Sequence, residues 1–368
     1  MTLSDLNIIK WTEDDFFNGK EQWSNLLNSS DANKLFLSWD WVFNWWDIWG
    51  KKPNTQLYIV TVTANNELVG LAPLYINNTK IVKKLINVVR LEILGSSYRS
   101  DEGIRSEYLE FIVKKGIESE VNNILFDYIY NQNIWDEMIL SNLVQSGETC
   151  KTNQQFVNKS EAYYRIDLVE DTYTIDTTHS FKDYISGLGK NTRLKLINRR
   201  NQLAKHGNIS VEKISTHDIG NFIKTLNELH YQRWKQTCFD ESQSKFILSI
   251  FNALGHKQIT SCSLLKIDDR PISAMANITV DGTVYNLQMG FREGFDKKIS
   301  LGTLHIGYAI EDSFNNNEIK SFDLLAGAGK NSNYKERISL PHTRLETSQT
   351  IRRPSLKLLY YLKDHYLD

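Results

Sequence analysis

Residues that can move protons gather late in the chain. Asp323 lies within the otherwise apolar segment FDLLAG, where an ionised carboxylate is costly unless it is paired. The glycine-rich turn from Gly327 to Gly329 then leads to Tyr334 and Lys335. A carboxylate, a phenol and an ammonium group on neighbouring segments are suited to general acid–base chemistry. We therefore take Asp323, Tyr334 and Lys335 as candidate catalytic residues.

A second group of chemically capable residues lies in the segment LNELHYQRW, which predicts a helix. His230 and Arg233 are three positions apart, so on a helix they share a face and can point a base and a cation at one ligand. Trp234 follows directly. An isolated histidine on a helix is more often structural or exposed, so a catalytic and a structural interpretation of His230 both stay open.

A third feature is the positive charge of the predicted helix Asn191 to Gly207. Between Tyr184 and Val211 the sequence holds six lysines and arginines and not one aspartate or glutamate. Such runs usually face water, but like charges on one helix repel, so an anionic partner such as a phosphate, a nucleotide or an RNA backbone is the alternative. The six residues are Lys190, Arg193, Lys195, Arg199, Arg200 and Lys205.

The fourth feature is the junction FDKKISLGTLHIGYAI, where a strand leads through a loop into a helix. Free backbone N–H groups and the positive end of the helix dipole make such a start suitable for a phosphate. Lys297 and Lys298 add charge, and Gly302 permits close approach. An ordinary capped helix that starts near Ser300 is the competing interpretation.

Composition limits the class of protein. The chain has 368 residues, 41% of them hydrophobic, and a formal charge of −1, which excludes a globally basic nucleic-acid binder. Its three cysteines are widely spaced, which indicates neither a disulfide framework nor a zinc site. We find no signal peptide and no apolar run of about 18 residues. The sequence therefore predicts a cytoplasmic protein without a membrane span.

Local patterns predict two mixed α/β halves. In the first, strands 56–64 and 67–76 form a hairpin around Asn65 and Asn66, and in the second a similar hairpin is followed by a third strand. We place the domains at 1–172 and 173–368. The other expected strands are 88–95, 107–113, 135–143, 162–168, 261–267, 271–280, 283–291, 319–327 and 343–351; helices are expected at 118–132 and 301–314, and a loop at 145–159.

The stretch FLSWDWVFNWWDIWG, Phe36 to Gly50, holds five of the nine tryptophans. On a helix, Asp40, Asn44 and Asp47 form one narrow polar stripe and apolar side chains cover the rest. A buried aromatic core is the leading interpretation, and a ligand-stacking surface the alternative. Trp39, at the helix entrance, is the residue we expect to reach a substrate if any of them does.

The order of these motifs resembles the GNAT superfamily. The resemblance rests on the basic RxxxxxRR helix, LHxxRW, DDRPISA, GFxxxFD, SLGTLHIGYAIE, FDLLAG and the YK pair, and it is best from about Phe181 to Ile338. It is strongest to the CelD and BioF2-like acetyltransferase branch, a neighbour of the FemABX peptidyltransferases. It implies a mixed α/β fold of two tandem GNAT-like domains, each a twisted, mostly antiparallel sheet flanked by helices.

The resemblance also implies a donor site. GNAT enzymes carry an acyl group from a thioester, usually acetyl-CoA, to an amine. The pantetheine arm would pair with the strand at Gln288, Met289 and Gly290, and the pyrophosphate would rest on the following loop and helix. The residues in that loop and helix are Lys297, Lys298, Ser300, Leu301, Gly302 and Thr303. Here lysine replaces the family's Gln or Arg and serine its first glycine.

Roles for the remaining candidates follow from the same resemblance. Asp323 or His230 would be the base, Tyr334 the acid, and Lys335 with Arg233 would hold an anionic acceptor or stabilise charge. Substrate contacts are expected from Arg199, Arg200, Arg233, Trp234 and Trp39. No metal is implied.

The expected function is N-acyl transfer, with acetyl-CoA or another acyl-CoA as donor. The expected acceptor is an amino group of a small molecule such as an amino sugar, a sugar nucleotide or an envelope or secondary-metabolite precursor. Two alternatives stay open. One is a FemABX-like transferase that uses aminoacyl-tRNA, and the other is a non-catalytic GNAT scaffold in polysaccharide biosynthesis.

Overall fold

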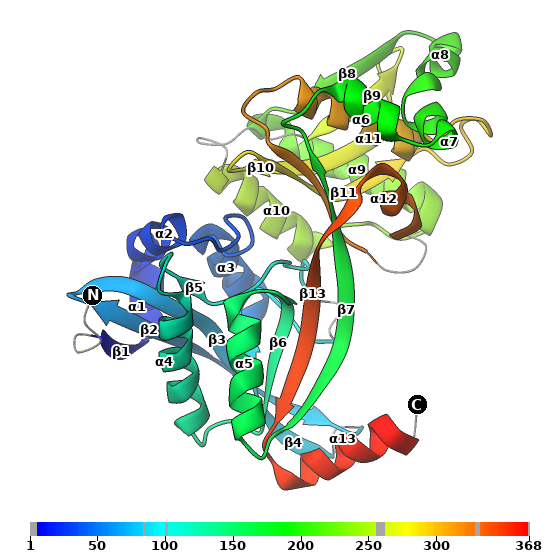
Figure 1. Ribbon diagram of the computed structural model, residues 1–368. Helices are drawn as coiled ribbons and strands as arrows, with labels where there is room; N and C mark the ends of the chain where they lie inside the picture. Colours follow the sequence, from blue (N-terminus) through cyan, green and yellow to red (C-terminus); the bar gives the residue numbers. More distant parts are fainter. Residues whose placement is uncertain (1–5, 84, 100–101, 255–261, 328–331, 367–368) are drawn as a thin grey trace. The chain divides into compact units, whose positions relative to one another are not determined.

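Two compact units make up the chain in the computed structural model, which describes residues 6–83, 85–99, 102–254, 262–327 and 332–366 (Figure 1). The first unit is Met1–Glu170 together with Thr343–Asp368, and the second is Asp171–His342. The change of unit after Glu170 lies close to the predicted boundary at 172. The predicted second domain ran to residue 368, however, whereas residues 343–368 belong to the first unit because their strand pairs there.

A mostly antiparallel sheet forms the first unit. The hairpin turn at Asn65 and Asn66 has φ values of 50° and 64°, as a tight turn of this kind requires. The strand order is β1-β2-β3-β4-β6-β13-β7, with β5 beside β3. The strands are β1 (Leu6–Trp11), β2 (Thr55–Ala64), β3 (Glu67–Ile81), β4 (Ile86–Ile93), β5 (Ile112–Val113), β6 (Glu137–Val144), β7 (Tyr163–Asp176) and β13 (Leu340–Ile351).

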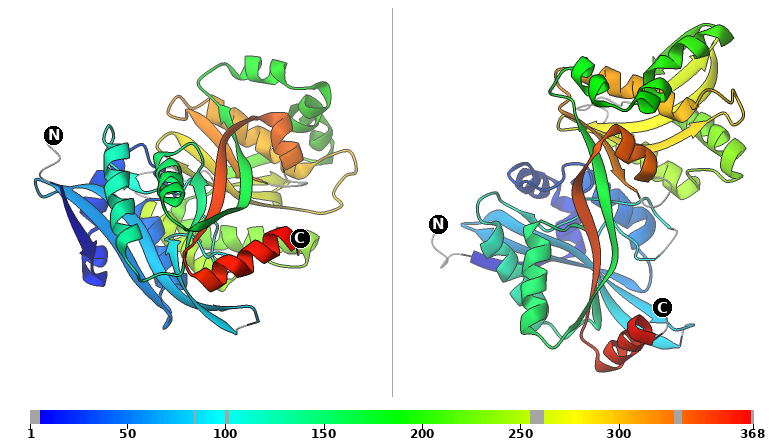
Figure 2. Two further views of the ribbon diagram at one scale, coloured as in Figure 1. Left: turned by 60° about the horizontal axis from the view of Figure 1, so that its bottom comes forward. Right: turned by 45° about the vertical axis from the view of Figure 1, so that its right-hand side comes forward.

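Helices cover this sheet, and α4 and α5 lie side by side against it (Figures 1 and 2). The helix α4 connects β4 to β6, which pair in parallel from Arg90↔Glu137 to Glu92↔Ile139. The helices of the unit are α1 (Glu13–Asn18), α2 (Lys20–Asn28), α3 (Trp39–Trp45), the π-helical turn η2 (Trp46–Gly50), α4 (Glu118–Asn131), α5 (Glu148–Lys159) and α13 (Pro354–Tyr366).

The tryptophan-rich helix is core, as its single polar stripe predicts. Trp41 and Trp45 are no more than 1% exposed, and Asp47 on the stripe faces solvent. Trp39 is also engaged within the unit. Its ring stacks on Phe43 at 4.3 Å, and its Nε1 donates to the carbonyl of Phe16 at 3.0 Å.

Two elements of the first unit differ from the sequence prediction. The expected loop at 145–159 contains α5, whose buried face is largely polar, with Thr149 and Asn153 each 1% exposed. An apolar periodicity could not reveal such a helix. The expected strand 107–113 is reduced to β5, because Tyr108 has φ = 55° and breaks the extended run.

The second unit repeats the plan of a hairpin, a third strand, a helix and a parallel strand. Its turns lie where the sequence predicts them, with φ values of 45° and 64° at Asp268 and Asp269. The strand order is β7-β12-β11-β10-β9-β8. The strands besides β7 are β8 (Ile209–Lys213), β9 (Ser263–Ile267), β10 (Arg270–Val280), β11 (Thr283–Phe291) and β12 (Ser321–Ala326). The expectation of mixed α/β units with mostly antiparallel sheets is thus confirmed.

Two helices cover opposite faces of β11. A Cβ on Gly290 would lie 2.8 Å from the Leu226 carbonyl of α9, whereas Met289 and Phe291 contact Gly302 of α11. Neighbouring residues of a strand point to opposite faces, so α9 and α11 lie on opposite sides. The helices are α6 (Phe181–Gly187), α7 (Lys190–Arg193), η3 (Leu194–Asn198), α8 (Arg200–Leu203), η4 (Ala204–His206), η5 (Thr216–Asp218), α9 (Ile219–Trp234), α10 (Glu241–Leu254), α11 (Leu301–Phe314) and α12 (Ser332–Ile338).

The basic segment is helical up to Gly207, as predicted, but a π-helical turn, η3, interrupts it. Its carbonyl at Leu196 lies against α11, where a Cβ on Gly307 would be only 2.1 Å from the carbonyl oxygen. Glycine at 307 therefore sets how closely the basic segment packs.

We predict that Gly307→Ala destabilises the protein by about 1–3 kcal/mol, because the added methyl meets backbone that cannot rotate away. Gly220→Ala is the matched control, since a Cβ there has nothing within 4 Å and lies on α9. That change should be neutral or stabilising by up to about 1 kcal/mol. Urea unfolding of both variants measures the difference, and equal midpoints would contradict the packing argument.

Candidate active site

An opening between two parallel strands is the central feature of the second unit. The strands β11 and β12 pair at Thr283↔Ser321, Val284↔Phe322 and Tyr285↔Asp323. Within their described residues the pairing stops there, although β11 continues to Phe291 and β12 to Ala326. Beyond this point β12 pairs irregularly with β7. The backbone edge of β11 from Gln288 to Gly290 therefore faces a gap in the ladder.

Asp323 lies where the opening begins and is 4% exposed. Its Oδ1 accepts the N–H of Leu325 at 2.7 Å, and Leu325 has φ = 61°, a conformation that costs energy in a branched residue. The carboxylate thus stabilises the irregular end of β12. A purely catalytic role for Asp323 would leave this contact unexplained.

Lys335 supports the same irregular segment from α12. It is 6% exposed, and its Nζ donates to the carbonyl of Leu325 at 3.0 Å and to that of Ala326 at 2.7 Å. A Cβ on Gly327 would lie 3.1 Å from this Nζ, so the glycine leaves room for the lysine. The structure therefore brings Asp323 and Lys335 to one place, as the sequence suggests. Gly329 and Ser261 lie outside the described residues.

Tyr334 packs, partly buried, against the core of the unit. Burial raises the pKa of its hydroxyl to about 12. The phenol is therefore protonated at neutral pH and is a hydrogen-bond donor and proton source, as its expected role as an acid requires.

His230 comes from α9, on the face that packs against Gly290. A Cβ on Gly290 would be 3.0 Å from the His230 backbone nitrogen. The ring Nδ1 lies 2.9 Å from the carbonyl of Gln236. Because a carbonyl only accepts, Nδ1 carries the proton of the neutral ring and Nε2 is left as the basic nitrogen.

On β11 itself, the backbone amide of Met289 is hydrogen-bonded to the side chain of the preceding residue, Gln288. The N–H of Met289 donates to Oε1 of Gln288 at 2.9 Å. A ligand that pairs with this stretch of strand can take the place of the Gln288 side chain without breaking the sheet.

A pocket of 340 Å³ lies at the start of α11. The N-cap residue of α11 is Ser300, whose hydroxyl makes no hydrogen bond to the helix backbone. It is hydrogen-bonded to the Thr303 hydroxyl instead, at 2.9 Å. Asp296 holds the loop by accepting the N–H of Lys298 at 2.7 Å, and this bond holds the pKa of Asp296 below its ordinary value. The lining residues are Arg233, Phe291, Arg292, Glu293, Gly294, Phe295, Asp296, Lys297, Ile299, Ser300 and Leu301.

Gly302 has a packing role that sequence reasoning did not identify. A Cβ there would lie 2.8 Å from the ring of Phe291 and 2.9 Å from the Met289 sulfur. The glycine lets α11 approach β11, and this close packing places the helix start beside the pocket.

Behind β11, three buried side chains form a hydrogen-bonded chain that the sequence analysis missed. His305 is fully buried, with Nδ1 2.9 Å from Ser273 Oγ and Nε2 3.0 Å from Ser263 Oγ. Ser273 donates to the Gly290 carbonyl at 3.2 Å. The histidine therefore donates from Nδ1 and accepts at Nε2. A histidine inside the apolar helix LGTLHIG was the one available signal, but its serine partners are remote in sequence.

The basic segment contributes less than expected to a ligand site. Arg200 forms an ion pair with Glu311 and lies 3.8 Å over the ring of Tyr308. It therefore ties the segment to α11. Arg199 is half-buried. Its backbone N–H donates to the carbonyl of Leu194, five residues earlier, at 3.0 Å, as in a π-helix.

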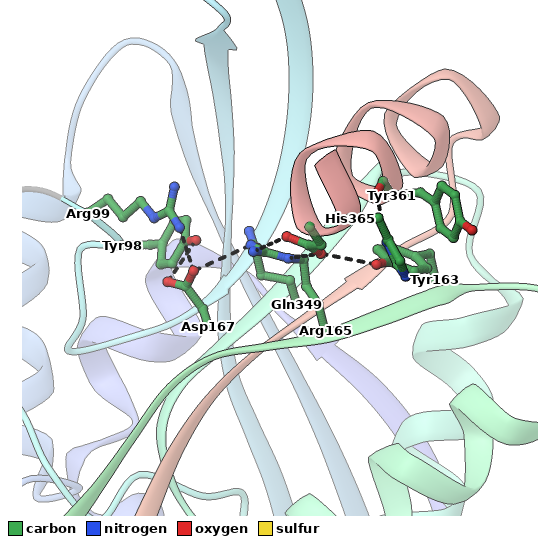
Figure 3. Close-up of polar contacts among 9 residues, drawn as sticks. Tyr98, Arg99, Tyr163, Arg165, Asp167, Gln349, Tyr361 and His365 are labelled. Carbon is green, nitrogen blue, oxygen red and sulfur yellow. Dashed lines mark hydrogen bonds and ion pairs between the residues drawn. The ribbon is translucent and has the colours of Figure 1, made fainter. Parts of the chain in front are cut away.

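The first unit carries a polar cluster of its own, on β7, β13 and α13 (Figure 3). Arg165 donates to Asp364 at 2.6 and 2.8 Å and also contacts Asp167 at 3.4 Å. Asp167 in turn accepts the hydroxyl of Tyr98 at 3.1 Å and forms an ion pair with Arg99. These contacts fasten the C-terminal helix to the sheet, so we interpret the cluster as structural.

Comparisons with known proteins identify a domain family for part of the chain and similar folds for most of it. Residues 190–336 match a family model described as "Acetyltransferase (GNAT) domain". This segment runs from α7 into α12 and contains the opening, His230 and the pocket at α11. Residues 190–336 thus form a domain of the GNAT acetyltransferase superfamily, as the sequence motifs indicate.

Solved structures extend the likeness in fold to the whole chain. The structure titled "Crystal structure of FemX" is 10% identical with a TM-score of 0.61, covering 96% of this chain and 99% of that chain. A protein titled L-PGS from Bacillus licheniformis is 13% identical with a TM-score of 0.50, covering 92% of this chain and 95% of its own. A conserved protein from Bacteroides thetaiotaomicron is 10% identical with a TM-score of 0.52, covering 94% and 99%. No curated protein matches.

Two further findings concern the described residues only. They contain no helix that is both long and apolar enough to cross a membrane. They also contain no group of three or more His, Cys, Asp or Glu side chains arranged to hold a metal ion.

Acid should destabilise the fold through His305. Burial lowers the pKa of His305 to about 3 from an ordinary 6.5, so the unfolded chain takes up this proton first as the pH falls. Stability is then lost as the pH falls below about 6.5, by at most about 1.4 kcal/mol per pH unit.

The variant His305→Gln isolates this effect, because an amide supplies a donor group and an acceptor group but does not titrate. Urea unfolding between about pH 7 and about pH 4 should give a shallower pH dependence for the variant than for the wild type. Parallel curves would contradict a neutral buried histidine.

Proposed function

We propose that the second unit is an N-acyltransferase that moves an acyl group, most simply acetyl, from acyl-CoA to an amine. The observation that carries the proposal is the opening after Tyr285↔Asp323. A strand edge that leaves its ladder offers backbone N–H and C=O groups to an amide-bearing ligand. The pantetheine arm of CoA contains two amides and fits such an edge.

The pocket at α11 supports the phosphate end of this donor. Arg292 and Lys297 line it beside Arg233, and the helix start adds free N–H groups and a favourable dipole. Within the described residues neither Arg292 nor Lys297 has an ion-pair partner. A pyrophosphate in the pocket could therefore pair with Arg292 and Lys297, although Glu293 and Asp296 also line it.

The proposed mechanism assigns the proton transfers to two side chains, His230 and Tyr334. Nε2 of His230 takes a proton from the acceptor ammonium, and the neutral amine attacks the thioester carbonyl carbon. A backbone N–H of the Gln288 to Gly290 edge donates to the developing oxyanion. As the new C–N bond forms and the C–S bond breaks, Tyr334 donates its proton to the departing sulfur. The nitrogen then gives its second proton to the Tyr334 oxygen, which restores the hydroxyl and leaves a neutral amide and a thiol.

Asp323 and Lys335 then act as positioning residues. Asp323 was the alternative base, but its contact with Leu325 and the bonds from Lys335 to the adjacent carbonyls support a role in shaping β12. The acceptor we propose is an amino group on a small molecule, such as an amino sugar, a sugar nucleotide or an envelope or secondary-metabolite precursor. The compartment we propose is the cytoplasm.

One observation favours a second candidate function. Lys190, Lys195 and Lys205 on the basic segment are exposed, as a surface for a nucleic-acid backbone would be. A FemABX-like transfer from aminoacyl-tRNA would use that surface and the same opening. The non-catalytic alternative, a GNAT scaffold in polysaccharide biosynthesis, predicts binding of neither donor.

Ligand-induced stabilisation separates these functions. CoA or acetyl-CoA at about 100 times its Kd should stabilise the protein by about 2.7 kcal/mol if the donor is CoA. Binding of tRNA with a steep salt dependence would favour the second function. A melting temperature that changes with neither ligand would favour the non-catalytic scaffold function.

Substitutions test the mechanism once a donor and an acceptor are identified. We predict that His230→Ala lowers kcat by about 10²- to 10⁴-fold, as the loss of a general base does. Tyr334→Phe should lower kcat by a comparable factor with little change in donor binding.

His217→Ala serves as the control, because His217 is an exposed histidine of the same unit. Asp323→Asn should lower the melting temperature as well as activity, since its carboxylate orders β12. Full activity of His230→Ala, Tyr334→Phe and Asp323→Asn, all soluble and folded, would remove this mechanism.

A further inference from the structure

Trp234 is unlike the other tryptophans of the chain. All nine lie within the described residues, and Trp234 alone is exposed, with 57% of its surface accessible. Burial of a large aromatic ring is strongly favourable, so an exposed tryptophan beside a pocket is a candidate ligand contact.

The ring is held at the end of α9 rather than left loose. Lys235 ends the helix with φ = 56°, and its N–H donates to the carbonyl of Tyr231 at 2.9 Å. The Arg233 guanidinium lies 4.7 Å from the centre of the Trp234 ring and 4.8 Å from that of Phe291. A flat cation is thus supported between an aromatic residue of β11 and Trp234.

Arg233 also connects this ring to the pocket at α11. It lines the pocket together with Arg292 and Lys297, and it is 3.8 Å from Glu293. An aromatic ring therefore stands directly beside cations arranged around an uncapped helix start. A ligand that matches both features carries phosphate groups and, next to them, a flat aromatic ring.

We propose that Trp234, backed by Arg233, is the stacking platform for the adenine of the acyl donor. The inference rests on the proposed function, which places the donor phosphates in the adjacent pocket. Adenosine is common to both candidate donors, since CoA carries an adenosine 3′,5′-bisphosphate and aminoacyl-tRNA ends in adenosine. Stacking of a base on an aromatic side chain is worth about 1–3 kcal/mol, and a neighbouring guanidinium adds cation–π attraction.

Binding of matched probes to wild type, Trp234→Ala and Trp234→Phe tests the platform. The probes are CoA, 4′-phosphopantetheine, which lacks the nucleotide, and an RNA hairpin ending in CCA. Trp234→Ala should lower the affinity for the nucleotide-bearing donor by about 5- to 100-fold, and Trp234→Phe should retain most of the affinity. The affinity for 4′-phosphopantetheine should not change. The arm that responds, CoA or RNA, identifies the source of the adenosine.

Tyr231→Ala is the control, because Tyr231 is 53% exposed one turn away but is not backed by Arg233. It should change the affinity less than about twofold. Equal losses for CoA and 4′-phosphopantetheine in Trp234→Ala, or no loss for either, would overturn the platform. Unchanged donor binding would leave the exposed ring as a contact for another protein.

A nucleotide without any acyl arm keeps this test independent of the proposed activity. Adenosine 3′,5′-bisphosphate should quench the fluorescence that is lost in Trp234→Phe, and ribose 5-phosphate should not. If the bisphosphate quenches while neither CoA nor the RNA binds, the proposed donor is wrong and the platform stands. If the bisphosphate behaves like ribose 5-phosphate, the platform is wrong whatever the donor.

Discussion

The second unit depends on how far β11 stays paired with β12. The ladder holds through Tyr285↔Asp323 and then stops, although both strands continue. Asp323 and Lys335 stabilise that ending, one through the N–H of Leu325 and the other through its carbonyl. Without these two side chains, the backbone N–H and C=O groups of β12 would be expected to pair regularly with those of β11. Two buried polar side chains therefore stabilise the end of β12 at the point where its pairing with β11 stops.

Packing on the two faces of β11 then positions the helices α9 and α11 beside the opening. Gly290 lets the backbone of α9 come close on one face, and Gly302 lets α11 come close on the other. These contacts put His230 against Gly290 on one face of β11 and the start of α11 beside the pocket. Behind the strand, Ser273 donates to the Gly290 carbonyl and is itself bonded to His305 of α11. The same strand thus carries the proposed donor contact and the main packing contacts of the unit.

Sequence reasoning succeeds here where the signal is local. The helix expected at 301–314 is observed as Leu301–Phe314, because its apolar run is long and bounded, and the hairpin turns follow from asparagine and aspartate pairs that tolerate positive φ. It fails where polar residues are buried. The buried face of the helix α5 includes Thr149 and Asn153, so its sequence has the polar composition of a loop.

For the site, sequence reasoning selects residues but not all of their roles. Gly302 is a packing contact, and Arg200 is bound by Glu311. The chain from Ser263 to His305 to Ser273 could not be foreseen, because nothing in a linear sequence relates residues that meet only after two strands and a helix have packed.

The return of residues 343–368 to the first unit has a consequence for how the chain is made. The strand β13 pairs with β6, and Leu356 and Tyr360 of α13 cover Val88 and Ile351. A ribosome delivers this strand and helix only after the entire second unit has been synthesised. The first unit must therefore wait with β6 unpaired on one side while the second unit, continuous in sequence, is free to fold. The half of the protein that is translated first can therefore complete its sheet only after the other half has been translated.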